Sequence, residues 1–369
     1  MREDASDWLR RLLWLGALSL TACSQHIPRI AWQDSGLIDC VPAGSLGKKG
    51  KLQTCETSAI AIRDDKVWLA NDKDSLPPTS AFFTLARSAL QGHVEYGQLQ
   101  FLNAGPVAKA RKIEELSHSR TLDLTLAVTA FDRTPETEEK DAKAYNQLMI
   151  WRGADPSTAV RLPDPLAKNS MALRPLLQTA LADATTPTGP AYFKIEGMSQ
   201  DDQGTLWLGI RETGPDYEHP QYRLWLLETT RRQTKSGEFK LGSDFKRIKL
   251  IEHGSDLNGW GLSGLLYDSK RKGLWISASR EVGEGQPLQS RLFFLPNRQR
   301  ERGHLRSVQA LSTDTPWIAP HKIEGLAFAD ADTLIAICDE DRTQSPVHVN
   351  GKDLIRQPHQ GVFLRIALH

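Results

Sequence analysis

The chain has 369 residues, of which 40% are hydrophobic and 25% are charged, a balance that can bury a large globular core. Its 46 basic and 45 acidic side chains nearly cancel to a formal net charge of +1, so no overall field favours nucleic acid. The sequence therefore argues against a nucleic-acid partner.

The N-terminal segment is predicted to be a targeting signal and not part of the fold. Arg10 and Arg11 precede an apolar run, residues 12–20, that is too short to span a bilayer. Leu20-Thr21-Ala22-Cys23 resembles the lipobox of bacterial lipoproteins, which implies cleavage after residue 22 and lipidation of Cys23. A plain cleaved signal peptide or a short buried helix is the alternative, and the acidic Glu3, Asp4 and Asp7 are unusual in a basic signal region.

The residues after the lipobox predict where the protein is placed. Residues 23–28 are expected to be a tether, and Ser24 in place of an aspartate resembles outer-membrane sorting. We therefore expect an outer-membrane lipoprotein of the bacterial cell envelope that faces the periplasm. An exported protein meets an oxidising compartment, so Cys40 and Cys55 are predicted to form a disulfide. Cys338 lies in an apolar strand and is expected to be buried.

Short strands with turn residues between them follow in five units. Two early strands are predicted at residues 29–32 and 36–40. The strands predicted in the units are 58–62, 67–70, 82–85 and 95–101; 122–130, 147–151 and 159–162; 206–210, 223–227 and 245–251; 264–267, 274–278, 292–295 and 305–311; and 324–328, 334–337 and 361–366. A charged loop is expected at 134–143 and a short amphipathic helix near 171–182.

The units are copies of one pattern: a short strand, a turn, a stronger strand and a charged exit. Lys194-Ile195-Glu196-Gly197 and Lys322-Ile323-Glu324-Gly325 open the two clearest copies, and weaker copies begin at Glu56, Lys112 and Gly261. Because such units cannot bury their own faces, a repeat predicts a closed or stacked architecture. We predict an all-β, five-bladed β-propeller over residues 29–369, with six blades as the alternative. The last unit lacks a fourth strand, which the strand near 29–32 could supply.

These motifs resemble a known family. The Ile-Glu-Gly opening and the Leu206-Trp207-Leu208-Gly209-Ile210 strand look like the phytase-like propellers labelled "esterase-like activity of phytase" and related exported propellers of unknown function, over most of residues 56–368. The resemblance implies a hydrolase of phosphate or carboxylic esters. The Glu-Gly pair also resembles gluconolactonase-type propellers, in which the Glu binds a divalent metal, although Met198 and Leu326 replace the proline that follows there.

Three glutamates are the candidate metal ligands. Glu114, Glu196 and Glu324 share one position in the repeat, which Ser58 and Ser263 occupy in the other two units. Inner strands of a propeller line one axis, so we expect the three carboxylates to converge and to need a cation, protons or basic partners. Ca²⁺ or another divalent cation would suit them. The alternative is structural: each Glu pairs with a neighbouring Lys or accepts backbone N–H bonds.

Charged residues at the exits of the second strands are the candidate substrate-binding groups, because basic and acidic side chains together can bind an anion and transfer protons. They are Asp72, Lys73, Arg211, Glu212, Arg280, Glu281, Asp339 and Asp341. The alternative is that strand exits are charged because they meet solvent. The histidines, His321 among them, are expected at the surface, and Trp68, Trp207 and Trp275 between blades.

Two functions remain open on the sequence. The first is a metal-assisted hydrolase of a small anionic ester. The second is a non-catalytic scaffold that binds an envelope protein on a propeller face, a possibility that the lack of a nucleophile motif favours. In both, the membrane is reached through the lipid anchor.

Overall fold

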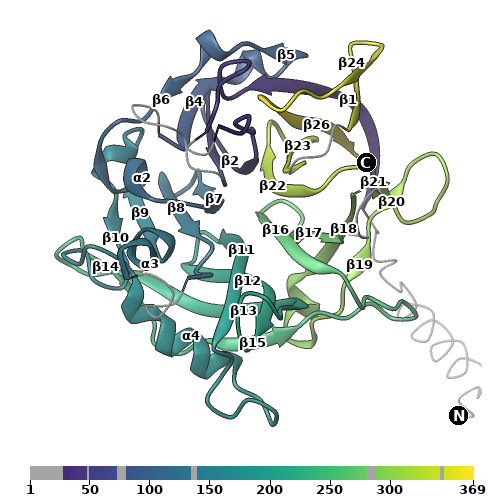
Figure 1. Ribbon diagram of the computed structural model, residues 1–369. Helices are drawn as coiled ribbons and strands as arrows, with labels where there is room; N and C mark the ends of the chain where they lie inside the picture. The colour runs from purple at the N-terminus through teal and green to yellow at the C-terminus, as the bar shows by residue number, and fades with distance from the viewer. Residues whose placement is uncertain (1–27, 48–49, 73–79, 134–138, 281–287, 341–344) are drawn as a thin grey trace, which may run out of the picture.

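Five antiparallel sheets surround a single axis as the blades of a β-propeller (Figure 1). This computed structural model describes residues 28–47, 50–72, 80–133, 139–280, 288–340 and 345–369. Blades 1 to 5 are numbered by their innermost strands, which are β2 (Thr57–Arg63), β7 (Ile113–Ser119), β11 (Tyr192–Gln200), β16 (Gly261–Asp268) and β22 (Ile323–Phe328). The propeller has five blades, as predicted, and not six.

The other strands of each blade follow outward in chain order. Blade 1 continues with β3 (Lys66–Asn71), β4 (Phe82–Ala86) and β6 (Gln100–Phe101), and blade 2 with β8 (Leu124–Thr129), β9 (Leu148–Arg152) and β10 (Val160–Arg161). Blade 3 continues with β12 (Thr205–Gly214), β13 (Gln221–Gln233), β14 (Phe239–Leu241) and β15 (Lys246–Lys249). Blade 4 continues with β17 (Gly273–Arg280), β18 (Gln289–Pro296), β19 (Arg306–Ser307) and β21 (Ile318–Ala319).

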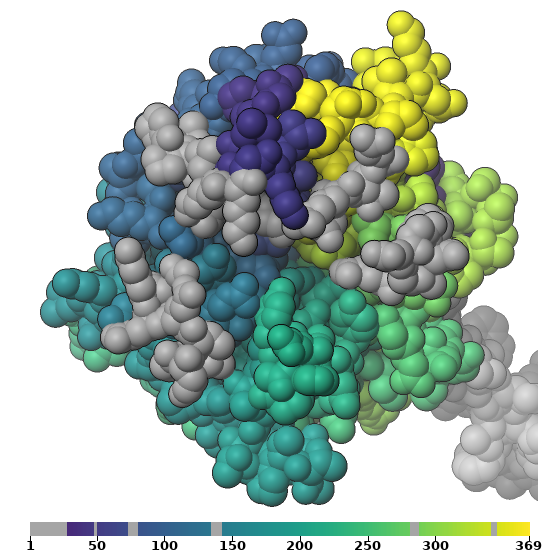
Figure 2. Space-filling view, viewed as in Figure 1, coloured from purple at the N-terminus to yellow at the C-terminus, as the bar shows by residue number. Residues whose placement is uncertain are grey.

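Blade 5 is built from both ends of the chain. β23 (Thr333–Cys338) and β26 (Gln360–Leu368) follow β22, and the N-terminal β1 (Arg29–Asp39) then pairs with β26. The register runs from Ile30 opposite Leu368 to Asp39 opposite Gln360. The N-terminal strand therefore completes the last blade, as predicted, but the two segments expected there are one continuous strand. Figure 2 shows the purple N-terminal and yellow C-terminal segments side by side.

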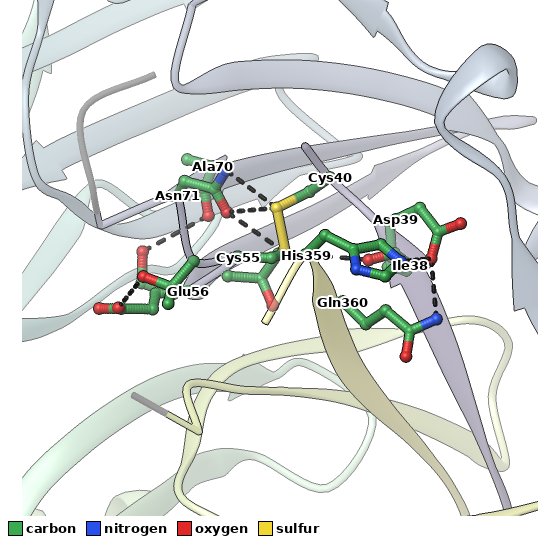
Figure 3. Close-up of a disulfide and its surroundings, with 12 residues drawn as sticks. Ile38, Asp39, Cys40, Cys55, Glu56, Ala70, Asn71, His359 and Gln360 are labelled. Atoms are coloured by element: carbon green, nitrogen blue, oxygen red, sulfur yellow. Dashed lines mark hydrogen bonds and ion pairs between the residues drawn. A yellow bond between two sulfur atoms is a disulfide. The ribbon is translucent and has the colours of Figure 1, made fainter. Parts of the chain in front are cut away.

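A disulfide lies beside this closure (Figure 3). Cys40 follows β1 and Cys55 precedes β2, and their Cα atoms are 5.6 Å apart. The backbone N–H groups of both cysteines donate to the segment before β26, Cys40 to His359 at 3.1 Å and Cys55 to Pro358 at 2.7 Å. The bridge thus ties the outer strand of blade 5 to the inner strand of blade 1.

The core lies between neighbouring blades. Trp68, Trp207 and Trp275 on the second strands are fully buried there, as predicted. Truncating a buried aromatic side chain of this size to alanine costs about 3–5 kcal/mol. The same strands that carry the charged exits are therefore held in place by the largest apolar side chains.

Several elements differ from the prediction. Besides α4 (Arg174–Leu181), which was expected, α2 (Gly105–Lys109) and α3 (Glu139–Tyr145) are present. The strand predicted at 95–101 is instead a 3₁₀ turn at Tyr96–Gln98 followed by β6, because Glu95 and Gln98 form a capping box. The remaining elements are β5 (His93–Val94), β20 (Gln309–Ala310), β24 (Pro346–Val349), β25 (Lys352–Ile355) and 3₁₀ turns at Arg87–Ala89, Pro156–Thr158, Met171–Leu173 and Asn297–Arg302. Across the described ranges, no helix is long and apolar enough to cross a membrane.

Candidate functional site

Every inner strand carries a β-bulge at the same place. In β11 the register jumps from Ile195 opposite Ile210 to Gly197 opposite Gly209, so Glu196 is the extra residue. The corresponding bulge residues in the other blades are Ser58, Glu114, Ser263 and Glu324. A bulge re-aims the side chain of its extra residue. The repeat position that carries the glutamates is therefore a position with special backbone geometry in all five blades.

The residue after the bulge is small in four blades because the inner strands approach one another closely. A Cβ atom on Gly264 would lie 1.9 Å from the carbonyl oxygen of Glu324, and one on Gly325 would lie 3.0 Å from the backbone nitrogen of Ile60. Blade 2 differs, since it has Glu115 at this place. In the Glu-Gly pair of the repeat, the bulge thus directs the carboxylate, and the glycine lets the backbone approach the next blade closely.

Glu114, Glu196 and Glu324 converge on the axis, and we call them the axial cluster. One carboxylate oxygen of each lies within 4.8 Å of those of the other two, and the side chains are at most 2% exposed. Three like charges this close repel strongly in a buried site. The cluster is consequently stable only with compensating cations or protons.

Basic side chains supply part of that compensation, and the lysine two residues before each glutamate takes part. Lys322 Nζ lies 2.9 Å from Glu324 Oε1, and Lys194 Nζ contacts Glu196 and lies 3.5 Å from Glu114 Oε1. Arg211 Nη1 lies 3.1 Å from Glu196 Oε2. Because Lys194 reaches the glutamates of two blades, it links blade 2 to blade 3 at the axis.

The three glutamates titrate differently. Burial raises the pKa of Glu114 to about 8 and holds the pKa of Glu324 well above its usual range. Burial also acts to raise the pKa of Glu196, but Arg211 and Lys194 outweigh it and lower that pKa to about 2. At neutral pH Glu196 is therefore ionised while Glu114 is largely protonated, an arrangement that can separate a base from an acid.

A second carboxylate group lies at the same mouth. Glu56, Asp72 and Asp339 have carboxylate oxygens within 4.8 Å of one another. Lys322 Nζ lies 3.5 Å from Asp339 Oδ2, so this group borders the axial cluster. Glu56 was not among the candidates drawn from the sequence. A signal was present, because it stands two residues before the bulge, where three other blades have lysine.

The predicted substrate-binding residues divide into three sets. The first set lies at the axial mouth and consists of Asp72, Arg211 and Asp339. Glu212 belongs with them, because its carboxylate lies 3.4 Å from Arg211 Nε and accepts a hydrogen bond from the Tyr192 hydroxyl at 2.7 Å. Arg280 donates instead to Gln289 and stacks over Trp260. Lys73, Glu281, Asp341 and the proposed lipidation residue Cys23 lie outside the described residues.

One histidine corrects the expectation that all of them lie at the surface. His321 is completely buried, and its Nδ1 lies 2.8 Å from Glu340 Oε1. The sequence did not reveal this pair because its members come from different strands, one before β22 and one after β23.

The charges also extend from the axis toward solvent. Lys112 Nζ lies 3.9 Å from Glu114 Oε1 and 2.7 Å from Asp132 Oδ2, and Arg133 Nη1 lies 3.6 Å from that same oxygen. The Arg133 side chain is 31% exposed. Arg133 also stacks over the rings of Tyr145 and Tyr217. A continuous line of alternating charges therefore connects the surface with Glu114.

Comparison with known proteins gives remote similarities to solved structures. No family model matches the chain, and no curated protein matches it. A PQQ-bound aldose sugar dehydrogenase from Streptomyces coelicolor aligns at 12% identity and TM-score 0.34, covering 92% of this chain and 100% of that one. A Bombyx mori GH32 beta-fructofuranosidase mutant in complex with sucrose aligns at 7% identity and TM-score 0.40, covering 96% and 70%. A GH43_12 protein from a capybara gut metagenome aligns at 11% identity and TM-score 0.40, covering 92% and 57%.

Proposed function

We propose that this propeller is a hydrolase of phosphate or carboxylic esters that works at the axial cluster with the help of a divalent cation, Ca²⁺ being the first candidate. The observation that carries the proposal is the approach of three carboxylate oxygens to within 4.8 Å of one another. Each of these glutamates also has one buried oxygen without a hydrogen bond, although that of Glu196 lies 3.1 Å from Arg211 Nη1 and that of Glu114 lies 3.5 Å from Lys194 Nζ. Hard oxygen donors of this kind fit Ca²⁺ or Mg²⁺. A bound cation would supply Lewis-acid polarisation of an ester oxygen.

The protein's own groups divide the proton transfers. Glu196, whose pKa is lowered to about 2, is ionised at neutral pH and acts as the general base toward a water molecule. In the metal-free protein Glu114, whose pKa burial raises to about 8, holds a proton at neutral pH, which it would release on binding a cation. Lys194 contacts both carboxylates, so it keeps them at a fixed separation during these transfers.

Recognition of an anionic ester falls to the solvent side of the cluster. Arg133 is the exposed end of the charge line that leads to Glu114, and its guanidinium can pair with a carboxylate or phosphate through two parallel hydrogen bonds. Tyr217, 53% exposed, lies under that guanidinium and offers an apolar surface to the rest of the substrate.

The resemblance to phytase-like propellers points the same way, since the motif residues Glu196 and Glu324 are the ones that converge. We further propose that the protein is lipid-anchored through Cys23 and acts in the periplasm at the outer membrane. The tether of residues 23–28 leads directly into β1, so the propeller would stand close to the bilayer.

A non-catalytic scaffold is the second candidate, and one observation favours it. Each axial glutamate already has a basic partner, Lys194 for two of them, Arg211 for Glu196 and Lys322 for Glu324. Such pairs can hold the blades together without a metal, because removing one partner of a buried pair is strongly destabilising.

The deciding experiment measures hydrolysis of p-nitrophenyl phosphate and p-nitrophenyl acetate by the purified full-length protein, with metal content determined on the same sample. We expect hydrolysis of at least one ester, loss of it with chelator, and recovery with Ca²⁺. Glu196→Gln should lower kcat by about 100-fold or more, because the general base is lost. Glu252→Gln is the matched control. Glu252 also forms an ion pair, with Arg291 at 2.9 Å, but it is not a member of the axial cluster. A metal-free protein that hydrolyses neither ester would contradict the hydrolase proposal and leave the scaffold as the remaining candidate.

A further inference from the structure

A cavity of about 260 Å³ opens at the opposite end of the axis, and we call it the lower pocket. The inner strands begin at the axial cluster and end here, so all five blades contribute to its wall. One residue from each blade illustrates this: Ile62, Arg120, Gln200, Leu266 and Leu326. The volume is just below the range of about 300–1,000 Å³ usual for small-molecule sites, so an occupant must be small.

The wall combines an apolar interior with charged groups. Ile60, Leu116 and Leu326 are buried apolar side chains of the wall, and the ring of Phe328 adds an aromatic surface. An apolar wall with a few converging polar groups is the usual composition of a ligand site. The lower pocket therefore suits a molecule with an apolar body.

Most charges of the pocket are already satisfied within the fold. Arg271 Nη1 pairs with Asp268 Oδ2 at 3.0 Å, and Lys270 Nζ pairs with Asp332 Oδ1 at 3.2 Å. The carboxylate of Asp202 accepts hydrogen bonds from the hydroxyl groups of Ser119 at 2.6 Å and Thr121 at 2.8 Å. Asp332 lies outside the pocket wall, the hydroxyl groups leave the negative charge of Asp202 in place, and Asp330 is the third carboxylate of the wall.

Arg120 is the exception. Its guanidinium donates to the carbonyl oxygen of Phe328 at 3.4 Å, and within the described ranges no carboxylate pairs with it. His118 stands two residues earlier on the same wall, where its Nδ1 lies 2.9 Å from the Thr125 hydroxyl. Burial lowers the pKa of His118 to about 4, so at neutral pH it adds a neutral hydrogen-bonding group and no second charge. Arg120 is therefore the cation of the wall that has no carboxylate partner among the described residues, and it stands beside an apolar surface and the carboxylates of Asp202, Asp268 and Asp330.

We propose that the lower pocket binds a small carboxylate with an apolar body, whose carboxylate pairs with Arg120 and whose body lies against Leu116, Leu266 and Leu326. This site is distinct from the axial cluster, because the buried side chain of Glu115 crosses the axis between them and accepts a hydrogen bond from the Leu265 N–H at 3.1 Å. It does not depend on the hydrolase proposal, and a failure of either leaves the other standing.

Calorimetric titration of the full-length protein with octanoate tests this site, with 1-octanol as a neutral probe of the same length. We expect octanoate to bind more tightly than roughly 1 mM and more tightly than octanol. Arg120→Gln should weaken octanoate binding by about tenfold or more and leave octanol unchanged, because the charge-assisted pair is lost. Leu266→Ser should weaken both probes.

Arg87→Gln is the matched control. Arg87 is also an exposed arginine that donates to a carbonyl oxygen of blade 5, that of Ala329 at 3.1 Å, but it does not line the lower pocket. Octanoate binding should be the same in this variant as in the wild type. The proposal is overturned if the wild type binds no octanoate, if octanol binds equally well, or if Arg120→Gln binds octanoate like Arg87→Gln.

Discussion

The carboxyl group of Glu115 on blade 2 accepts a hydrogen bond from the backbone N–H of Leu265 on blade 4, at 3.1 Å across the axis. Its other oxygen accepts from the N–H of Leu116, also at 3.1 Å, and the side chain is completely buried. Burial raises the pKa of Glu115 well above its usual range. One side chain therefore joins two non-adjacent blades and fills the centre that glycine or alanine leaves free in the other four.

The opposite pKa shifts of Glu114 and Glu196 predict two pH windows of stability. The folded pKa of Glu114 is raised from 4.5 to about 8, so its contribution is present below 4.5 and is lost as pH rises toward 8. That of Glu196 is lowered from 4.5 to about 2, so its contribution is present above 4.5 and is lost as pH falls toward 2. In urea unfolding from pH 3 to 8, Glu114→Gln should reduce the pH dependence of the free energy of unfolding between pH 4.5 and 8. Glu196→Gln should reduce that dependence below pH 4.5. Equal slopes in both variants and the wild type would contradict the assignment.

Chelation should distinguish a metal site from a set of ion pairs. If the axial cluster binds Ca²⁺, saturating ion stabilises the folded protein by about 2.7 kcal/mol at a hundredfold excess over Kd. Chelator should then lower the wild-type Tm, and Glu324→Gln should remove most of that response. If the cluster holds only ion pairs, chelator should change nothing and Glu324→Gln should destabilise the protein, because Lys322 loses a buried partner. A Tm that ignores both chelator and added Ca²⁺ rules out the metal.

The close approach of the inner strands predicts a large effect from a single methyl group. Gly264→Ala would place a Cβ 1.9 Å from the backbone oxygen of Glu324, so the two blades must separate. We expect a loss of about 1–3 kcal/mol or more in the free energy of unfolding. Gly97→Ala is the control, because no atom lies within 4 Å of its added Cβ. Equal stability of the two variants would show that the inner strands are not tightly packed.

The disulfide should stabilise the ring closure. Cys40 and Cys55 are 15 residues apart, and a loop of that size contributes about 3 kcal/mol in the chain-entropy treatment. The double substitution to alanine should lower the free energy of unfolding by that order. Thiol alkylation of the native protein without reductant should label neither cysteine, and mass spectrometry that found both labelled would refute the bridge.

The proposed lipid anchor depends on Cys23. Cys23→Ala should leave the protein uncleaved or release it from the membrane fraction, because the thiol proposed to carry the lipid is gone. Metabolic labelling with a radioactive fatty acid measures this directly, with Cys338→Ala as a control that retains Cys23. Equal label in the wild type and Cys23→Ala would disprove lipidation at this residue.

The blade number and the ring closure were predictable from the sequence. Five copies of one strand pattern each need neighbours to bury their faces, and the missing fourth strand of the last copy pointed to the segment that became β1. Short local elements were harder to predict. The 3₁₀ turn at Tyr96–Gln98 replaced an expected strand because one pair of side chains, Glu95 and Gln98, capped it.

At the site, the repeat determined by itself that Glu114, Glu196 and Glu324 occupy equivalent positions, because equivalent residues of a closed ring must face one axis. Only the tertiary structure decided which groups meet them. Lys194 reaches a glutamate of another blade, and Glu115 meets Leu265, 150 residues away in the chain. Such contacts depend on how closely the blades approach and on where each bulge aims its side chain. The repeat in the sequence does not specify how closely the blades approach or where the bulge side chains point. Both follow from the packing of blades that are distant along the chain.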